Sequence, residues 1–318
     1  MTEHTNTNTN TNTLDNMGAY VMPTATTTTN VVDAALEAGA LFQVKSEAMT
    51  VAGSVPTIKD GSYKGQPLQK IIYRDLPEGP KVLNVVHPSF PESNYLQVAE
   101  IAEALFPETC QAMAVIEDGE RFSFTQAIGE GVDLGGGDVI RPHLLWTASL
   151  NSTWSTGAHG LGHRFFCTNQ LPLADAHIKV RRTLNHDFTL VTRSAIIAQV
   201  TERLQAFGEK VTTLKRIKVS EAQTDALINS LIPEPAEGAH GKTINTYQTK
   251  VAAIRYYLGE ESSGPAAGTA WGFWNAVQSA ESHKLTEGKA QARRQVDMIV
   301  NESQPLTTAA ETRLLAMV

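Results

Sequence analysis

Hydrophobic residues change their spacing along the chain. In the first half they form short runs, often alternating with polar residues and separated by Gly, Pro, Asn and Asp, which is typical of β-strands joined by turns. The predicted strands are residues 44–58, 68–74, 81–86, 113–116, 121–125, 139–148, 159–167 and 177–182. Because the later strands follow one another through short loops, we expect hairpins and a meander of antiparallel strands.

In the second half the apolar residues recur every three or four positions, the spacing of amphipathic helices. The expected helices there are residues 189–208, 220–232, 243–258, 268–282, 286–303 and 307–316. Gly208 should end the first of them and Ser220 should cap the second. Two earlier helices, the first capped by Asn30, are expected at residues 31–42 and 94–106. This order predicts an α+β fold, in which an antiparallel β-sheet with packed helices is followed by a mainly helical C-terminal part.

Composition divides the chain into three parts. Residues 1–29 are rich in Thr and Asn and lack the apolar side chains that offset the entropy cost of ordering, so we predict a disordered tail. Residues 30–232 are expected to form an α+β core domain, and residues 242–318 a helical C-terminal region that packs on it. The Pro- and Gly-containing segment 233–241 is the predicted linker.

The overall composition, 42% hydrophobic and 19% charged, is that of a globular protein. No apolar run approaches the roughly 18 residues of a membrane span. The first Lys or Arg is Lys45, and no apolar leader precedes it, so no targeting segment is predicted. Cys110 and Cys167 are too few for a disulfide framework. We therefore expect a cytoplasmic protein.

Charge is distributed unevenly. The formal net charge of −7 argues against general attraction to nucleic acid, but residues 175–218 carry nine Lys and Arg against four acidic residues. That segment has a net charge of +5, which leaves −12 for the rest of the chain. Because salt screens surface charges beyond about 8 to 10 Å, a local positive zone can bind a polyanion on an acidic protein. The alternative is a basic strand and helix that are simply solvated.

Within this zone we expect phosphate contacts from a strand edge, a helix and the following loop. The candidate nucleic-acid-binding residues are Lys179, Arg181, Arg182, Arg193, Lys210, Lys215, Arg216 and Lys218. Strand alternation places Lys179 and Arg181 on one face and Arg182 on the other, so one groove cannot use all of them.

Motifs for catalysis or metal binding are weak. His159, His163 and Cys167 are four residues apart, but in a strand this spacing covers about 13 Å, too far for a shared zinc ion. We expect the Phe-Phe-Cys run that ends at Cys167 to be a buried strand. The HGKT at 240–243 resembles a phosphate-binding loop but has Ala236 where that motif needs Gly. No Gly-x-Ser-x-Gly elbow occurs. The expected protein is not an enzyme and has no catalytic residue, metal or cofactor.

The densest aromatic cluster lies at residues 270–277. Trp271 and Trp274 share one side of the expected helix and could stack on nucleobases. A core helix packed with large rings is the favoured interpretation.

Several segments, in order, resemble the phage/plasmid-like family known as domain of unknown function 932. These segments are "VVDAALEAGALFQVKSEAMTV", "IIYRDLPEGPKVLNVVHPSF", "RFFCTNQL", "HIKVRRT" and "GTAWGFWNAVQSAESHK". The resemblance extends over about residues 30 to 303. It departs from the family at His87, because family members commonly have a Tyr after the preceding Val-Val strand.

The resemblance implies a bacteriophage, prophage or plasmid origin, and therefore the cytoplasm of a host cell, without implying a catalytic mechanism. Analogy at the level of fold suggests a remote relationship to phage single-strand annealing proteins, which assemble into rings or filaments. The first hypothesis is a non-catalytic, self-associating protein that binds or anneals single-stranded DNA in recombination or replication. The alternative is a phage protein-interaction factor for host takeover, counter-defence or assembly, with no nucleic-acid role.

Overall fold

A computed structural model describes residues 30–317 apart from 61, 63, 91, 93, 108–109, 165–169, 179–192, 287–290 and 302. The tail predicted at residues 1–29 and the Phe-Phe-Cys run therefore lie outside the described residues. So does the end of the basic strand predicted at 177–182.

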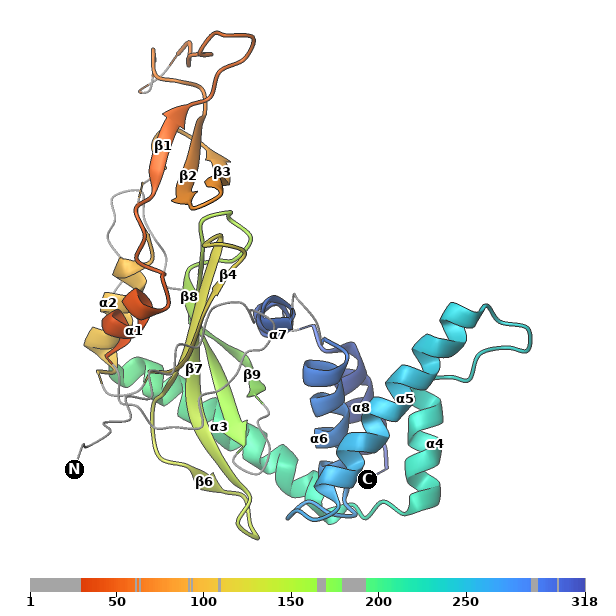
Figure 1. Cartoon of the computed structure of the whole chain (residues 1–318). Helices are drawn as coiled ribbons and strands as arrows, with labels where there is room; N and C mark the ends of the chain where they lie inside the picture. Colours follow the sequence, from red (N-terminus) through yellow and green to blue (C-terminus); the bar gives the residue numbers. More distant parts are fainter. Residues whose placement is uncertain are drawn as a thin grey trace, which may run out of the picture.

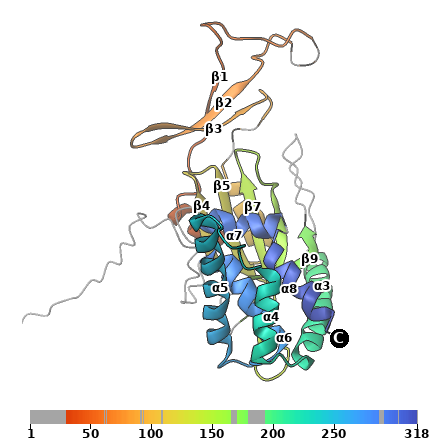
Figure 2. The same ribbon diagram turned by 90° about the vertical axis from the view of Figure 1, so that its right-hand side faces the viewer.

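The first half of the chain forms two antiparallel sheets. A three-stranded sheet stands out from the body as a narrow arm (Figures 1 and 2), in the order β1 (Lys45–Ala48), β2 (Lys70–Leu76) and β3 (Gly79–Val86). The main sheet has the order β4-β5-β7-β8-β9, and β6 pairs with β7. Its strands are β4 (Cys110–Ile116), β5 (Arg121–Ala127), β6 (Val132–Asp133), β7 (Val139–Ser149), β8 (Gly157–Arg164) and β9 (Gln170–Ile178).

Helices lie on both sides of the main sheet (Figure 1). The first pair, α1 (Val31–Glu37) and α2 (Leu96–Leu105), packs on one side. The long helix α3 (Arg193–Arg216) contacts the sheet and leads into a helical group on the other side. That group contains α4 (Glu221–Leu231), α5 (Gly241–Glu261), α6 (Ala270–Ser279), a π-helical turn η1 (Ala280–Lys284), α7 (Gln291–Val300) and α8 (Pro305–Leu315). The predicted α+β fold with a mainly helical C-terminal part is confirmed.

The hydrophobic core follows the alternation of the strands. Phe124 and Trp146 are buried in the larger of two apolar clusters, which also includes residues of α1, α2 and α3. The neighbouring residue Leu145 points the other way and packs with Val296 and Ile299 of α7. Because successive strand residues face opposite sides, the sheet is covered by apolar contacts on both.

The helix starts predicted from local sequence are confirmed. The Asn30 side chain accepts hydrogen bonds from the backbone N–H groups of Val32 (2.8 Å) and Asp33 (3.1 Å) at the start of α1. Ser220 and Gln223 form a reciprocal capping box at the start of α4. Caps are local interactions of a few residues, which is why sequence identifies them.

The predicted helix ends are less accurate. The helix expected at 31–42 ends at Glu37, shortly before Gly39 adopts a left-handed φ of 72°. Gly208 was predicted to end a helix, and this was wrong, because α3 continues to Arg216. Phe207 and Val211 on either side of Gly208 are buried, so packing of the continuing helix outweighs the helix-breaking preference of one glycine.

One strand prediction also needs correction, because the strand expected at 44–58 is confined to Lys45–Ala48. The hairpin expected from the strands at 113–116 and 121–125 is confirmed, since Ile116 pairs with Arg121 across a four-residue loop. Glu117 and Asp118 adopt left-handed φ values of 52° and 54° in this loop. Non-glycine residues pay a cost for such values, which the surrounding contacts must offset.

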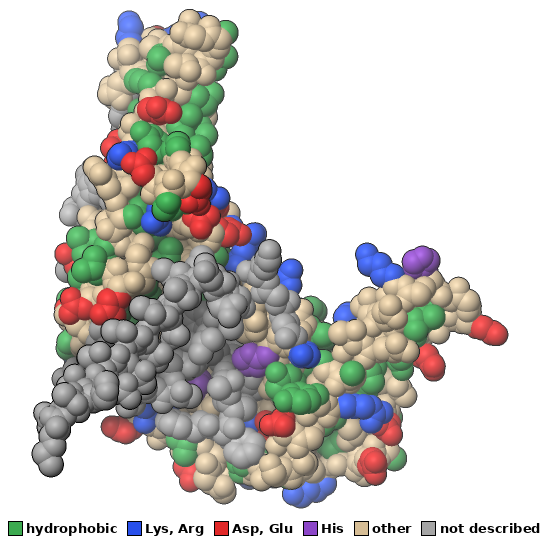
Figure 3. Space-filling view, in the orientation of Figure 1, with side chains coloured by type: hydrophobic (Ala, Val, Ile, Leu, Met, Phe, Trp, Pro, Cys, Tyr) green, Lys and Arg blue, Asp and Glu red, His purple; other side chains and the backbone are tan. Residues whose placement is uncertain are grey.

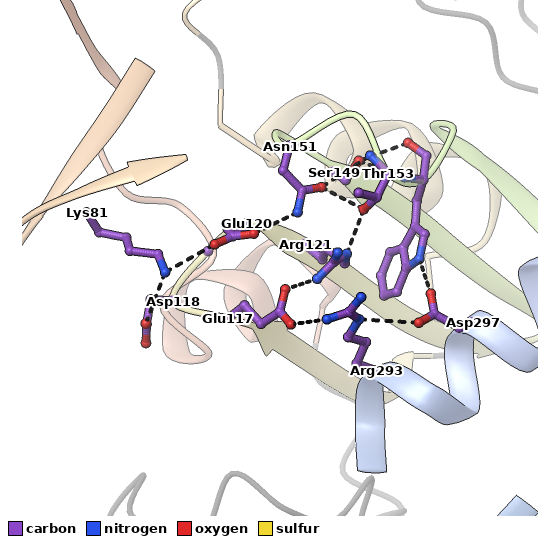
Figure 4. A network of polar contacts seen from close by, with 12 residues as sticks. Lys81, Glu117, Asp118, Glu120, Arg121, Ser149, Asn151, Thr153, Arg293 and Asp297 are labelled. Atoms are coloured by element: carbon purple, nitrogen blue, oxygen red, sulfur yellow. Dashed lines mark hydrogen bonds and ion pairs between the residues drawn. The ribbon is translucent and has the colours of Figure 1, made fainter. Parts of the chain in front are cut away.

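Those contacts join the arm to the main sheet (Figure 4). Lys81 of β3 lies 3.1 Å from a carboxylate oxygen of Glu120 and 4.0 Å from one of Asp118. Asn151, in the loop after β7, donates a 2.7 Å hydrogen bond to Glu120. The hairpin loop therefore holds the base of the arm.

The same loop also holds α7 against the sheet (Figure 4). Glu117 forms an ion pair with Arg121 and a second one, at 2.6 Å, with Arg293 of α7. Arg293 also pairs with Asp297 at 3.3 Å, and Asp297 accepts a 2.7 Å hydrogen bond from the indole of Trp154. These acidic side chains thus serve as ion-pair partners that connect three parts of the fold.

Among the described residues, no helix combines the length and apolar character needed to cross a membrane.

Candidate nucleic-acid interface

The structure separates the candidate cationic residues of the basic segment. Lys179, Arg181 and Arg182 lie outside the described residues. Arg193 and Arg216 are the first and last residues of the 24-residue helix α3, and both are exposed. At a rise of 1.5 Å per residue they are roughly 35 Å apart, so they do not share one patch.

The two ends of α3 differ in their surroundings. The guanidinium of Arg193 lies 5.3 Å from the centre of the Phe106 ring, an arrangement that orients the cation. Arg216 is exposed at the other end, and Lys218, just beyond it, is exposed as well. On the face seen in Figure 3, Lys and Arg side chains lie apart from one another with acidic side chains among them.

Two candidate lysines form ion pairs with carboxylates of the protein itself. Lys210 pairs with Glu311 of α8 at 2.9 Å. The ammonium of Lys215 lies 3.0 Å from Asp138 and donates to the carbonyl of Leu134 at 3.1 Å. The sequence prediction counted both as free positive charge, whereas the fold uses them to connect α3 to distant segments.

Lys215 belongs to a buried charge cluster. Arg164, at the end of β8, donates 2.6 Å hydrogen bonds to Asp138 and to Glu261, the last residue of α5. Trp271 donates a 2.8 Å hydrogen bond to the other oxygen of Asp138. Burial would raise the pKa of Asp138, but the bonds from Arg164, Trp271 and Lys215 outweigh it and hold that pKa below its usual range. The cluster joins the sheet to α3, α5 and α6.

The aromatic cluster of α6 is core, as favoured from the sequence. Trp271 and Trp274 are stacked 5.2 Å apart and are 1% and 4% exposed. A Cβ on Gly272 would lie 2.4 Å from the carbonyl oxygen of Ala266, so the helix needs glycine to approach this backbone. Asn275 is buried and donates a 2.8 Å hydrogen bond to the Trp271 carbonyl. Gly272 and Asn275 therefore have packing roles, and the two buried indoles cannot stack on a ligand.

Two histidine rings of the main sheet lie close together. His143 of β7 is buried, and its ring centre is 5.2 Å from that of His163 on β8. Burial, together with the nearby His163 and Arg141, lowers the pKa of His143 to about 4, although its hydrogen bond to the Arg141 carbonyl acts the other way. His159 and His163 lie in a strand as expected, and Cys167 is outside the described residues. Among the described residues, no group of three His, Cys, Asp or Glu could hold a metal ion.

Sequence reasoning predicted helix α5 at residues 243–258 but did not identify it as a candidate contact surface. The run from Gly238 to Gly259 contains no Asp or Glu but carries Lys242, Lys250 and Arg255. Arg255 pairs with Asp225 at 2.9 Å, whereas the two lysines form no ion pair with the described part of the chain. This run without Asp or Glu was visible in the sequence and is the signal that could have identified the surface.

The two lysines of α5 lie on a common surface. Lys242 and Lys250 line an open hollow of about 370 Å³, together with Tyr247 and Pro235. Because α5 carries no carboxylate before Glu260, no acidic side chain of the helix lies beside these lysines, and they are positioned to contact an anionic ligand lying along the helix. We call the surface formed by Lys242, Tyr247 and Lys250 the α5 surface.

Comparison with known proteins places most of the chain in one family. Residues 83–309, well over half of the 318 residues, match the family described as "Domain of unknown function (DUF932)". No curated protein and no solved structure matches the chain. The relationship to phage single-strand annealing proteins therefore stays a prediction. The chain belongs to the DUF932 family.

Proposed function

We propose that the protein binds single-stranded DNA and acts without covalent chemistry in the recombination or replication of a phage or plasmid. The observation that supports this proposal is the α5 surface, where two lysines without carboxylate partners among the described residues lie in the run from Gly238 to Gly259, which contains no Asp or Glu. On a chain with net charge −7, such a segment is where a phosphate backbone would be attracted rather than repelled.

Binding of this kind needs no catalytic group. Lysines hold phosphates as point charges and leave the bases accessible to a complementary strand. Arg193, Arg216 and Lys218 are additional phosphate contacts in this proposal, at the two ends of α3. Lys210 and Lys215 are not, because their charge is already paired within the fold.

We also propose that the protein self-associates through its arm. β1 and β3 are the edge strands of the three-stranded sheet, and edge strands can pair with another chain. Val82 and Val85 of β3 are 53% and 41% exposed, so association would bury apolar surface. Several copies on one strand would multiply weak phosphate contacts into tight binding.

Mass photometry tests self-association directly. We expect species larger than the 34.4 kDa monomer, with more of them when a short single-stranded oligonucleotide is added. Replacing Val82 and Val85 with Thr, which suits a strand but is polar, should shift the distribution toward monomer. A purely monomeric wild-type protein with and without oligonucleotide would contradict the proposal.

The DNA-binding proposal is tested by fluorescence anisotropy over a salt series. The Lys242→Ala/Lys250→Ala variant should bind single-stranded DNA roughly tenfold more weakly at low salt. The slope of log affinity against log salt should fall by about 1.4, because each phosphate contact on a single strand contributes about 0.7. Both lysines belong to an accessible surface, so folding should be unchanged.

The matched control is Lys59→Ala/Lys64→Ala, which removes the same charge from exposed positions at the end of the arm. This control should bind like the wild type. Equal losses in both variants would mean that only total charge matters, and the α5 surface would then not be the site. If the wild-type protein does not bind single-stranded DNA at low salt, the proposal is refuted.

A protein-interaction role is the second candidate, favoured by the exposed valines of the arm and by the net charge of −12 outside residues 175–218. It predicts that a pull-down from infected cells recovers one protein stoichiometrically and that nuclease treatment does not release it. Loss of every partner after nuclease would favour the DNA-binding function instead.

A further inference from the structure

A hollow of about 680 Å³ lies between α5, η1 and the start of α7. It shares no lining residue with the hollow at the lysines, and its side opposite α5 is formed by His283, Lys284 and Gln291. Its volume is within the range of small-molecule sites and is sufficient for a nucleotide. The fold does not fill it with side chains of the described residues.

The far wall of the hollow is formed by a π-helical turn. α6 continues directly into η1, where Leu285 N–H bonds to the carbonyl of Ala280, five residues earlier. This wider turn brings His283 and Lys284 to the side that faces α5. π-helical turns are rare and occur often at functional sites.

Hydrogen bonds hold this wall in place. Gln295 of α7 donates to the carbonyl of Ser282 at 2.9 Å and lies 3.3 Å from Nδ1 of His283. Burial lowers the pKa of His283, so its imidazole is neutral at pH 7. The wall thus combines a fixed neutral ring with one lysine.

The near wall presents aromatic surface. Tyr256 is 61% exposed, which is unusual for a ring of this size, and it borders the hollow. The adjacent Tyr257 ring meets it edge-on at 5.1 Å and lies 6.3 Å from His283. A flat exposed ring supported at its edge is the arrangement on which a nucleobase can stack.

The charge around the hollow suits a nucleotide. Lys284 lines it, and none of the described residues that line it is acidic. Lys250 lies six residues before Tyr256, about 9 Å along α5 and about 120° around it. A strand with a base on Tyr256 would therefore continue around α5 to reach the lysines of the α5 surface.

We propose that this hollow receives an unpaired nucleobase of a single strand, with Tyr256 as the stacking platform and Lys284 beside the adjoining phosphate. The inference rests on the proposed function and deepens it, because duplex DNA keeps its bases inside the helix and cannot enter the site. The α5–η1 hollow therefore selects single strands, while the lysines of the α5 surface supply affinity for any phosphate backbone.

The test uses an oligothymidylate with one 2-aminopurine, whose fluorescence changes when the base stacks. On binding the wild-type protein, the fluorescence should change. The Tyr256→Ala variant should lose this change and bind the single strand roughly five- to a hundredfold more weakly, the range seen when a stacking ring is removed. Tyr256→Phe should restore both, because it keeps the ring. Affinity for a duplex of the same length should be the same in all three proteins.

The matched control is Gln248→Ala, an exposed residue of α5 that lines neither hollow. It should behave like the wild type in both measurements, and thermal melting should show that all variants are folded. If Tyr256→Ala binds and changes the fluorescence like the wild type, the base site is refuted while the DNA-binding function stands. If the wild type binds no single strand at low salt, the proposed function itself has failed.

Discussion

Replacing Arg164 with Ala should lower the free energy of unfolding by about 3 to 5 kcal/mol, the usual cost of breaking a buried ion pair from one side. Arg164 is completely buried and lies 2.6 Å from both Asp138 and Glu261. Lys215 remains beside Asp138 in the variant, so most of the lost stability should come from the buried Glu261 carboxylate. Because these residues come from β8, the loop before β7, α3 and α5, the loss should loosen the helical group from the sheet.

Guanidinium chloride unfolding at pH 7 measures this effect. The matched control is Arg255→Ala, which removes an arginine from the exposed ion pair with Asp225 and should cost less than about 1 kcal/mol. Combining Arg164→Ala with Glu261→Gln should cost less than the sum of the single changes, because the two residues share one interaction. A loss below 1 kcal/mol for Arg164→Ala would show that the cluster does not hold the two parts together.

The stability of the protein should fall as the pH is lowered from about 6.5 to 4. The pKa of His143 is about 4 in the fold, against about 6.5 in an unfolded chain. Between these values the unfolded state binds more protons, so the free energy of unfolding decreases as the pH falls. The stabilisation is complete above pH 6.5 and is lost near pH 4, a change of roughly 3 kcal/mol at 1.36 kcal/mol per pH unit. The pKa of neighbouring His163 is also lowered, mainly by burial, and adds in the same direction.

Denaturant unfolding at pH 7 and pH 4.5 measures this dependence. In His143→Gln, the difference in stability between the two pH values should shrink by about 2 kcal/mol. The side-chain amide of glutamine does not take up a proton in this pH range. Because the stability of the variant at pH 4.5 is compared with its own stability at pH 7, a change in its overall stability does not affect the result. His87→Gln, at an exposed position, should keep the wild-type difference. An unchanged difference in His143→Gln would mean that protonation of this histidine is not coupled to unfolding.

Sequence reasoning did not identify ion pairs between residues that are far apart in the chain. The charges of Lys210 and Lys215 are evident in the sequence, but Glu311 and Asp138 are 101 and 77 residues away. Their pairing depends on how α8 and the loop before β7 meet α3. Tyr256 illustrates the reverse case. The Trp pair of α6 was the more conspicuous aromatic cluster, yet it is buried, whereas Tyr256 on the neighbouring helix is exposed.

Sequence by itself determined the fold class, the succession of strands and helices, the caps at Asn30 and Ser220 and the core role of the α6 aromatic residues. These features depend on residue spacing and on contacts a few positions apart, which a linear pattern records. Tertiary structure decided how far α3 runs past Gly208, which cations remain unpaired and where an aromatic ring meets an open hollow. Those outcomes depend on packing between segments far apart in the chain, and burial and charge pairing there outweigh local preference.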